Sequence, residues 1–114
     1  MTGPSKTMYQ APTILIIDDQ PNSLDVIVND LNAMGFETLV ALNGEDGLDQ
    51  ALRQQPDLIL LDVMMPGWDG FRTCREIKAT PAIRDIPVLF LSALDDTHSK
   101  LTGFEIGGVD YITK

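Results

Sequence analysis

Four short apolar segments of this chain each end in a polar or charged residue, and this pattern limits the fold more than any other feature. The segments and the residues that follow them are Ile14–Ile17 with Asp18 and Asp19, Leu58–Leu61 with Asp62, Val88–Leu91 with Ser92, and Val109–Thr113 with Lys114. Continuous apolar runs separated by helical segments are typical of a parallel sheet that is buried on both faces. The carboxyl ends of parallel strands share one edge, where open α/β sheets hold their ligands. The sequence therefore predicts a ligand site at that edge.

The segments between the apolar runs have the spacing of amphipathic helices. Apolar residues recur at helical intervals after Pro21, and Gly35 is the expected stop. Thr38–Leu42 has the composition of one more strand, and Asn43 is the expected cap of the helix that follows it, which Pro56 closes. Strands and helices thus alternate along the chain.

Two further helices are expected in the second half of the chain. One follows a loop at Val63–Trp68 and is capped by Asp69, and it carries Cys74 as a half-buried core thiol. The other begins near the acidic residues Asp95 and Asp96. Because crossovers between parallel strands are right-handed, the predicted fold class is α/β, with a doubly wound parallel sheet.

Length, charge and cysteine content narrow the class of protein. A chain of 114 residues forms one domain, which we place at residues 13–114 behind a flexible tail at residues 1–12. The net charge of -9 argues against direct nucleic-acid binding. No apolar run is long enough to span a membrane, and the first residues lack a signal-peptide core. With a single cysteine, a reducing cytoplasm is the expected location.

An acidic cluster is expected where the first and third strands end. Neighbouring strands lie about 4.8 Å apart, so Asp18, Asp19 and Asp62 crowd together if those strands are adjacent. Such a cluster either retains a proton or binds a cation. We favour Mg²⁺, with Mn²⁺ as a substitute, because a hard cation prefers carboxylate oxygens and retained waters.

The same edge carries the groups needed for phosphoryl transfer to a carboxylate. A carboxylate beside Mg²⁺ can attack a phosphoryl group, since the metal orients and neutralises the transferring oxygens. Ser92 could donate a hydrogen bond to a phosphoryl oxygen. Lys114 ends a strand roughly 10 Å from the centre and is long enough to reach inward.

These residues resemble the receiver domains of two-component response regulators. The segments that carry the resemblance are residues 14–19, 60–70, 91–93 and 107–114, and it covers the chain from about Thr13 to its last residue. It implies a flavodoxin-like, five-stranded sheet of order 2-1-3-4-5. The family pattern continues beyond Lys114 with a proline and a final helix, which would follow the residues of this sequence. The apolar face left there would be covered by further residues, by a partner or by a homodimer.

The resemblance also implies a role for each matching residue. Asp62 resembles the phosphoacceptor, and Asp19 and Asp62 resemble direct Mg²⁺ ligands. Asp18 resembles a ligand that acts through water, and the backbone carbonyl of Met64 resembles the remaining protein ligand. Three further positions match the family's switch hydroxyl, its lysine and its switch aromatic, and these are Ser92, Lys114 and Tyr111.

The implied function is that of a phosphoacceptor switch in a phosphorelay. A histidine kinase or a histidine phosphotransfer protein would supply the phosphoryl group, and the altered surface would control an output domain or effector protein. The domain would be no turnover enzyme, since it catalyses only its own phosphorylation and dephosphorylation. Met64 and Leu94 match the family positions that flank the attacking water, so we expect their apolar side chains to prolong the phosphorylated state.

Three other interpretations compete with this one. A phosphohydrolase of the haloacid dehalogenase type would need a second aspartate two residues after its nucleophile, whereas here the pair is adjacent and Gln20 follows. A pseudo-receiver that only docks proteins is typical of chains that have lost the acidic pair or the lysine, and both are present. A flavin-binding protein would have a Ser/Thr/Gly-rich phosphate loop after the first strand, where this chain places two acids.

Overall fold

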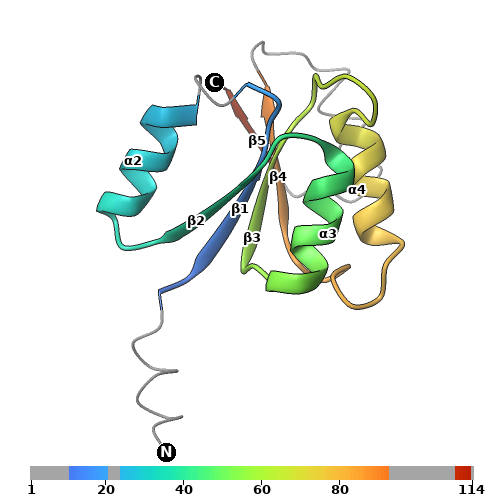
Figure 1. The fold of residues 1–114 in the computed structure, drawn as a ribbon, viewed down its shortest axis with the longest axis horizontal. Helices are drawn as coiled ribbons and strands as arrows, with labels where there is room; N and C mark the ends of the chain where they lie inside the picture. Colours follow the sequence, from blue (N-terminus) through green and yellow to red (C-terminus); the bar gives the residue numbers. More distant parts are fainter. Residues whose placement is uncertain (1–10, 21–23, 93–109, 114) are drawn as a thin grey trace, which may run out of the picture.

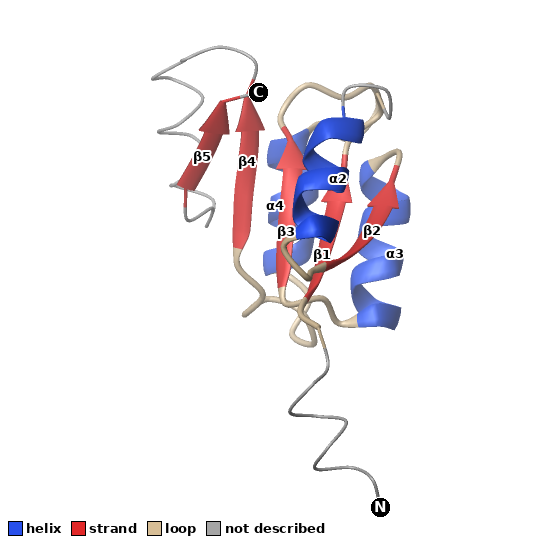
Figure 2. Ribbon diagram, turned by 90° about the vertical axis from the view of Figure 1, so that its left-hand side faces the viewer, coloured by secondary structure: helices blue, strands red, loops and turns tan. Residues whose placement is uncertain are grey.

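The computed structural model describes residues 11–20, 24–92 and 110–113 of the chain. Its strands form one parallel sheet in the order β2-β1-β3-β4-β5, and all of them point the same way in Figure 2. The strands are β1 (Thr13–Ile17), β2 (Glu37–Ala41), β3 (Leu58–Asp62), β4 (Val88–Ser92) and β5 (Asp110–Thr113). Their carboxyl ends therefore share one edge of the sheet, as the sequence predicts.

Helices cover both faces of this sheet. They are α2 (Asp25–Ala33), α3 (Gly44–Gln54) and α4 (Gly70–Lys78). Figures 1 and 2 show α2 on one face and α3 and α4 together on the other. The parallel α/β sheet with helices on both faces, which was predicted from the apolar runs, is confirmed. None of the helices among the described residues has the length and apolar character needed to cross a membrane.

Two of the expected helix caps are present. The side chain of Asn43 accepts a hydrogen bond from the backbone N–H of Asp46 at 2.7 Å, at the start of α3. The side chain of Asp69 accepts one from the backbone N–H of Arg72 at 2.8 Å, at the start of α4. Each bond satisfies a backbone donor that has no partner within the first helical turn.

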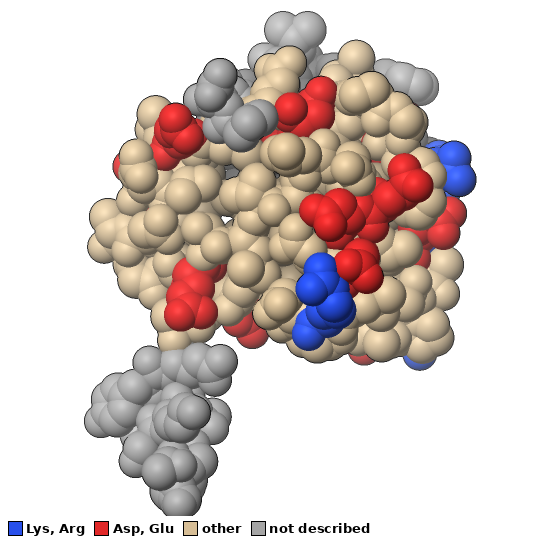
Figure 3. Space-filling view, in the orientation of Figure 1, with Lys and Arg blue, Asp and Glu red and all other residues tan. Residues whose placement is uncertain are grey.

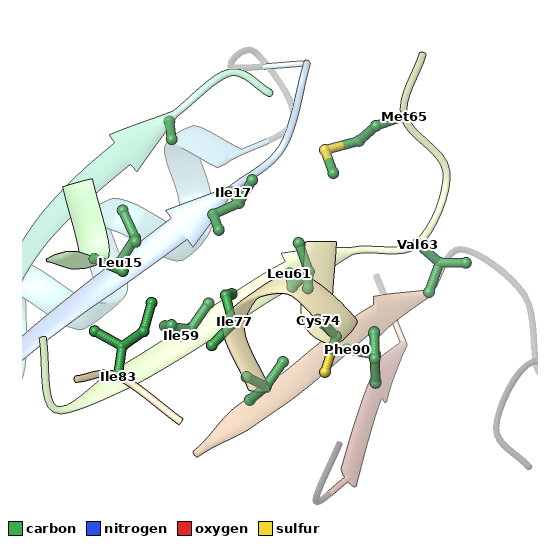
Figure 4. Packing of buried hydrophobic residues seen from close by; sticks show 13 residues of the cluster. Leu15, Ile17, Ile59, Leu61, Val63, Met65, Cys74, Ile77, Ile83 and Phe90 are labelled. Atoms are coloured by element: carbon green, nitrogen blue, oxygen red, sulfur yellow. The ribbon is translucent and has the colours of Figure 1, made fainter. Parts of the chain in front are cut away.

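Alternation along the strands divides the core into two clusters. Leu15 and Ile17 of β1 face α3 and α4, whereas Ile14 and Ile16 face α2. The larger cluster includes Cys74 and Ile77 of α4, and Figure 4 shows it between the helices and the sheet. β1 and β3 are apolar on both faces, so their side chains contribute to both clusters. Full burial of one Leu or Ile side chain stabilises the folded state by about 1.5–3 kcal/mol.

Two details differ from the sequence expectations. β2 spans Glu37–Ala41 rather than Thr38–Leu42, because the backbone N–H of Glu37 already bonds to the carbonyl of Pro12 and pairing with β1 begins one residue earlier. Cys74 is fully buried rather than half-buried, since it lies on the face of α4 that packs against the sheet.

Several expectations fall on other parts of the chain. The helix start at Pro21, the helix after Asp95 and most of the tail at residues 1–12 lie outside the described residues.

The burial of Cys74 leads to a prediction about its reactivity. Burial raises the pKa of the thiol, and the nearby charges of Lys78 and Arg75 oppose this rise only in part. Since the thiolate is the reactive form, we expect a thiol reagent at mildly alkaline pH to modify the folded protein at least about tenfold more slowly than the unfolded chain. Absorbance with a disulfide reagent measures this rate. Equal rates in buffer and in denaturant would contradict the buried position.

Candidate functional site

The pairing of β1 with β3 brings aspartates from distant parts of the sequence to the same edge. Ile17 lies opposite Leu61 in the register of the two strands. Asp18 follows Ile17 and Asp62 follows Leu61, so the two aspartates lie at equivalent positions at the ends of neighbouring strands. On the other side of β3, Asp62 lies opposite Leu91 of β4, so Ser92 is one residue further along.

The three predicted aspartates form one compact cluster. Carboxylate oxygens of Asp18, Asp19 and Asp62 all lie within 4.8 Å of one another. Asp18 is fully buried and Asp62 is 5% exposed, whereas Asp19 is partly exposed to solvent. Two carboxylates are thus enclosed by protein, and the third is partly open to solvent.

Backbone amides orient the two enclosed carboxylates. The N–H of Gln20 donates to Asp18 Oδ1 at 2.9 Å, and the N–H of Asp18 itself continues the ladder to the carbonyl of Ala41. The N–H of Met64 lies 3.4 Å from Asp62 Oδ1. Hydrogen bonds from neutral donors hold a carboxylate in place and stabilise its charged form.

The donor set fits a hard divalent cation. Asp19 Oδ1 is buried and accepts no hydrogen bond from the described residues. A buried polar atom without a partner is costly, and a cation at this point would satisfy it while neutralising the crowded charges. Three carboxylates with one side open to water match the oxygen ligands and retained waters of a Mg²⁺ site.

The loop between β3 and α4 forms one wall of this site. Met64 is 79% exposed although it comes only two residues after Asp62. Trp68 is partly buried, and the guanidinium of Arg72 lies over its ring, 4.7 Å from the ring centroid. A cation held against an aromatic face in this way stabilises a surface loop by roughly 0.5–1 kcal/mol.

The remaining predicted site residues are placed only by their backbone. Ser92 ends β4 and lies opposite Thr113 of β5. Tyr111 lies opposite Phe90, and Lys114, which follows Thr113, is outside the described residues together with Leu94. Their predicted roles therefore stay predictions. The strand register nevertheless brings Ser92 and the end of β5 to the edge that carries the aspartates.

Negative charge is not confined to the three clustered aspartates. In Figure 3, acidic side chains gather over the side of the molecule where Figure 1 places α3 and α4. Glu45 and Asp46 lie in the first turn of α3. An acidic surface raises the local concentration of divalent cations around the site.

The sequence and structure were compared with known proteins. The family model of the response regulator receiver domain matches residues 14–114. This chain belongs to the response regulator receiver domains. Members of this family are phosphoacceptor switches of two-component systems, so the resemblance seen in the sequence is confirmed.

Curated relatives support this membership. The chain is 43% identical over 103 residues to the DNA-binding dual master transcriptional regulator RpaA of Synechocystis. The match covers 90% of this chain and 43% of that protein. It is also 43% identical over 101 residues to the response regulator PleD of Caulobacter vibrioides, covering 89% of this chain and 22% of the relative. The chain thus spans less than half the length of these relatives.

Solved structures show the same receiver fold. The N-terminal domain of a response regulator receiver protein from Methanoculleus marisnigri matches with a TM-score of 0.83 and 42% identity, over 90% of this chain and 83% of that one. The receiver domain of the sensor histidine kinase PA1611 from Pseudomonas aeruginosa matches with a TM-score of 0.82 and 30% identity, over 91% and 85%. That structure has a magnesium ion coordinated in its active site cleft.

Sequence reasoning missed two features around this receiver site. The pairing of Arg72 with Trp68 was not expected, although their spacing of four residues at a helix start would have allowed it. The direct contact of Gly70 with the backbone of Asp62 was also missed, because no sequence pattern reports which glycine lies against another segment.

The crowding of carboxylates leads to a prediction about protein stability without Mg²⁺ and about the response of the melting temperature to Mg²⁺. Asp19→Asn removes one of three clustered charges, so we expect the metal-free protein to gain stability, of the order of 1 kcal/mol. We expect Mg²⁺ to raise the melting temperature of the unaltered protein, because it binds only the folded state, and to raise that of Asp19→Asn much less. Thermal unfolding with and without Mg²⁺ measures both effects.

Asp85→Asn provides the matched control. Asp85 is exposed and precedes β4, at the opposite edge of the sheet, and its substitution removes the same charge. Equal Mg²⁺ stabilisation of all three proteins would show that the cation does not bind at the cluster.

Proposed function

We propose that this receiver domain accepts a phosphoryl group on Asp62 and changes its surface when it does so. The observation that carries the proposal is the position of Asp62, which lies at the end of the central strand β3 within 4.8 Å of two other carboxylates. The donor would be a histidine kinase or a histidine phosphotransfer protein. The family membership of the chain supports this assignment.

The transfer step exchanges one phosphorus bond for another. A carboxylate oxygen of Asp62 attacks the phosphorus of a phosphohistidine, the new O–P bond forms, and the P–N bond breaks. The electron pair of that bond returns to the imidazole, and because the other ring nitrogen of the phosphohistidine carries a proton, the histidine leaves as a neutral imidazole. Hydrolysis later forms a bond from the oxygen of water to phosphorus and breaks the O–P bond to Asp62, which restores the carboxylate, while the water proton goes to solvent or stays on the released phosphate.

Mg²⁺ supplies charge neutralisation and orientation for the phosphoryl oxygens in this chemistry, and Mn²⁺ would substitute for it. Its protein ligands would be Asp19, Asp62 and the backbone carbonyl of Met64, with Asp18 acting through a water molecule. The N–H of Gln20, which bonds to Asp18 Oδ1, would keep that outer carboxylate aligned. The hydroxyl of Ser92 and the ammonium of Lys114 would contact the remaining phosphoryl oxygens.

The added charge would then be read as a change of surface. A phosphoryl group adds about -1.5 to -2 units of charge, which draws Ser92 inward and lets Tyr111 follow. This change would control an output domain or effector protein in the cytoplasm. We place the domain at residues 13–114, with a further helix after Lys114 completing the fold or a homodimer covering the apolar face there.

The test of this function is a phosphoryl adduct that requires both Asp62 and Mg²⁺. We expect intact mass spectrometry after incubation with acetyl phosphate to show one added phosphoryl group on the full chain, and none without Mg²⁺. Asp62→Asn should abolish the adduct, because the amide is a poor nucleophile. Asp85→Asn, the surface control, should retain it. An adduct that persists in Asp62→Asn would show that Asp62 is not the phosphoacceptor.

The lifetime of the adduct gives a second prediction. Met64 lies at the exposed mouth of the site, two residues from Asp62, and its apolar side chain offers no hydrogen bond to an attacking water. Met64→Asn would supply such a bond, so we expect hydrolysis of the phosphorylated domain to become severalfold faster. Loss of the adduct with time, after removal of acetyl phosphate, measures the rate. An unchanged lifetime would show that Met64 does not obstruct water.

A further inference from the structure

Gly70, the first residue of α4, lies directly against the backbone that carries Asp62. A methyl group at position 70 would overlap the carbonyl oxygen of Asp62 and would lie 2.8 Å from Val63 Cα and 2.9 Å from the carbonyl carbon of Asp62. All three atoms belong to the main chain. A main-chain atom of a central strand cannot rotate out of the way as a side chain can, so only glycine permits this approach.

The same residue closes the loop that follows Asp62. The N–H of Gly70 donates to the carbonyl of Val63 at 2.9 Å, so the chain leaves β3, forms the loop and returns to its starting point. Met64 lies within this closed loop, and its N–H faces Asp62 Oδ1 at 3.4 Å. Asp69, just before Gly70, caps α4 and keeps the helix end in place.

We propose that Gly70 is a positioning residue for the metal and phosphoryl site. Its missing side chain lets α4 dock on the main chain of Asp62, and its N–H fixes the start of the loop. Together these contacts set the direction of the Asp62 carboxylate and of the Met64 carbonyl. This inference rests on the proposed function, in which those two groups bind Mg²⁺.

Another glycine of the same helical layer provides a matched control. A methyl group at Gly44, the first residue of α3, would overlap the hydroxyl of Thr73 and lie 2.9 Å from Trp68 Cβ. The atoms it meets belong to side chains of α4 and its loop and not to the backbone of Asp62. Gly70→Ala and Gly44→Ala thus make the same chemical change at the first position of neighbouring helices, and only the methyl group at position 70 meets the main chain of Asp62.

Calorimetric titration of Mg²⁺ separates positioning from general destabilisation. We expect Gly70→Ala to weaken Mg²⁺ binding by about tenfold, at a temperature where circular dichroism shows both variants folded, and to slow phosphorylation by acetyl phosphate. Gly44→Ala should lower the melting temperature and keep the Mg²⁺ affinity of the unaltered chain. Unchanged affinity in a folded Gly70→Ala, or an equal loss in both variants, would overturn the inference.

A measurement on the unaltered protein covers the case in which Gly70→Ala does not fold. If loop closure and metal binding are coupled, Mg²⁺ should slow hydrogen exchange of the Gly70 amide more than that of the Gly47 amide, which bonds to the carbonyl of the cap residue Asn43 at the start of α3. Equal protection of both amides would contradict the coupling. Failure of the proposed function is distinguishable, because the unaltered protein would then form no Mg²⁺-dependent adduct at all.

Discussion

The pairing of β1 with β3 brings the carboxylates of Asp18 and Asp62 close together, although like charges repel each other. Asp18 and Asp62 follow the register pair Ile17 and Leu61, so the ladder determines their separation. Both strands are buried on two faces, and their ends cannot move apart without exposing core side chains to water. The hydrophobic core thus holds the carboxylates together against their repulsion, and a bound cation would neutralise them.

The loop between β3 and α4, which forms one wall of the site, is held in place by a steric contact. Gly70 brings the start of α4 against the main chain of Asp62, and Asp69 caps the same helix end. Arg72 and Trp68 then join the loop to the first turn of α4. The main chain of Asp62 is therefore in direct contact with the first residue of α4. A shift of Asp62 would be passed to α4 through this contact, and α4 reaches the surface of the domain.

Receiver domains similar to this chain occur within longer proteins. RpaA and PleD are each 43% identical to this chain, yet the chain covers only 43% of one and 22% of the other. Similar receiver domains thus occur in proteins of which they make up different shares. The site at the carboxyl edge explains how a phosphoryl group would be accepted, and it does not specify what the signal would control.

The sequence by itself determined the strands, their parallel sheet, the caps Asn43 and Asp69, and the identity of the three clustered aspartates. It could do so because apolar runs, capping residues and strand-end acids are local patterns. Only the tertiary structure decided that Asp18 and Asp62 are enclosed while Asp19 is partly exposed, that β2 begins at Glu37, and that Gly70 contacts the main chain of Asp62. These depend on which segments pack against one another across the fold, and no local pattern records that packing.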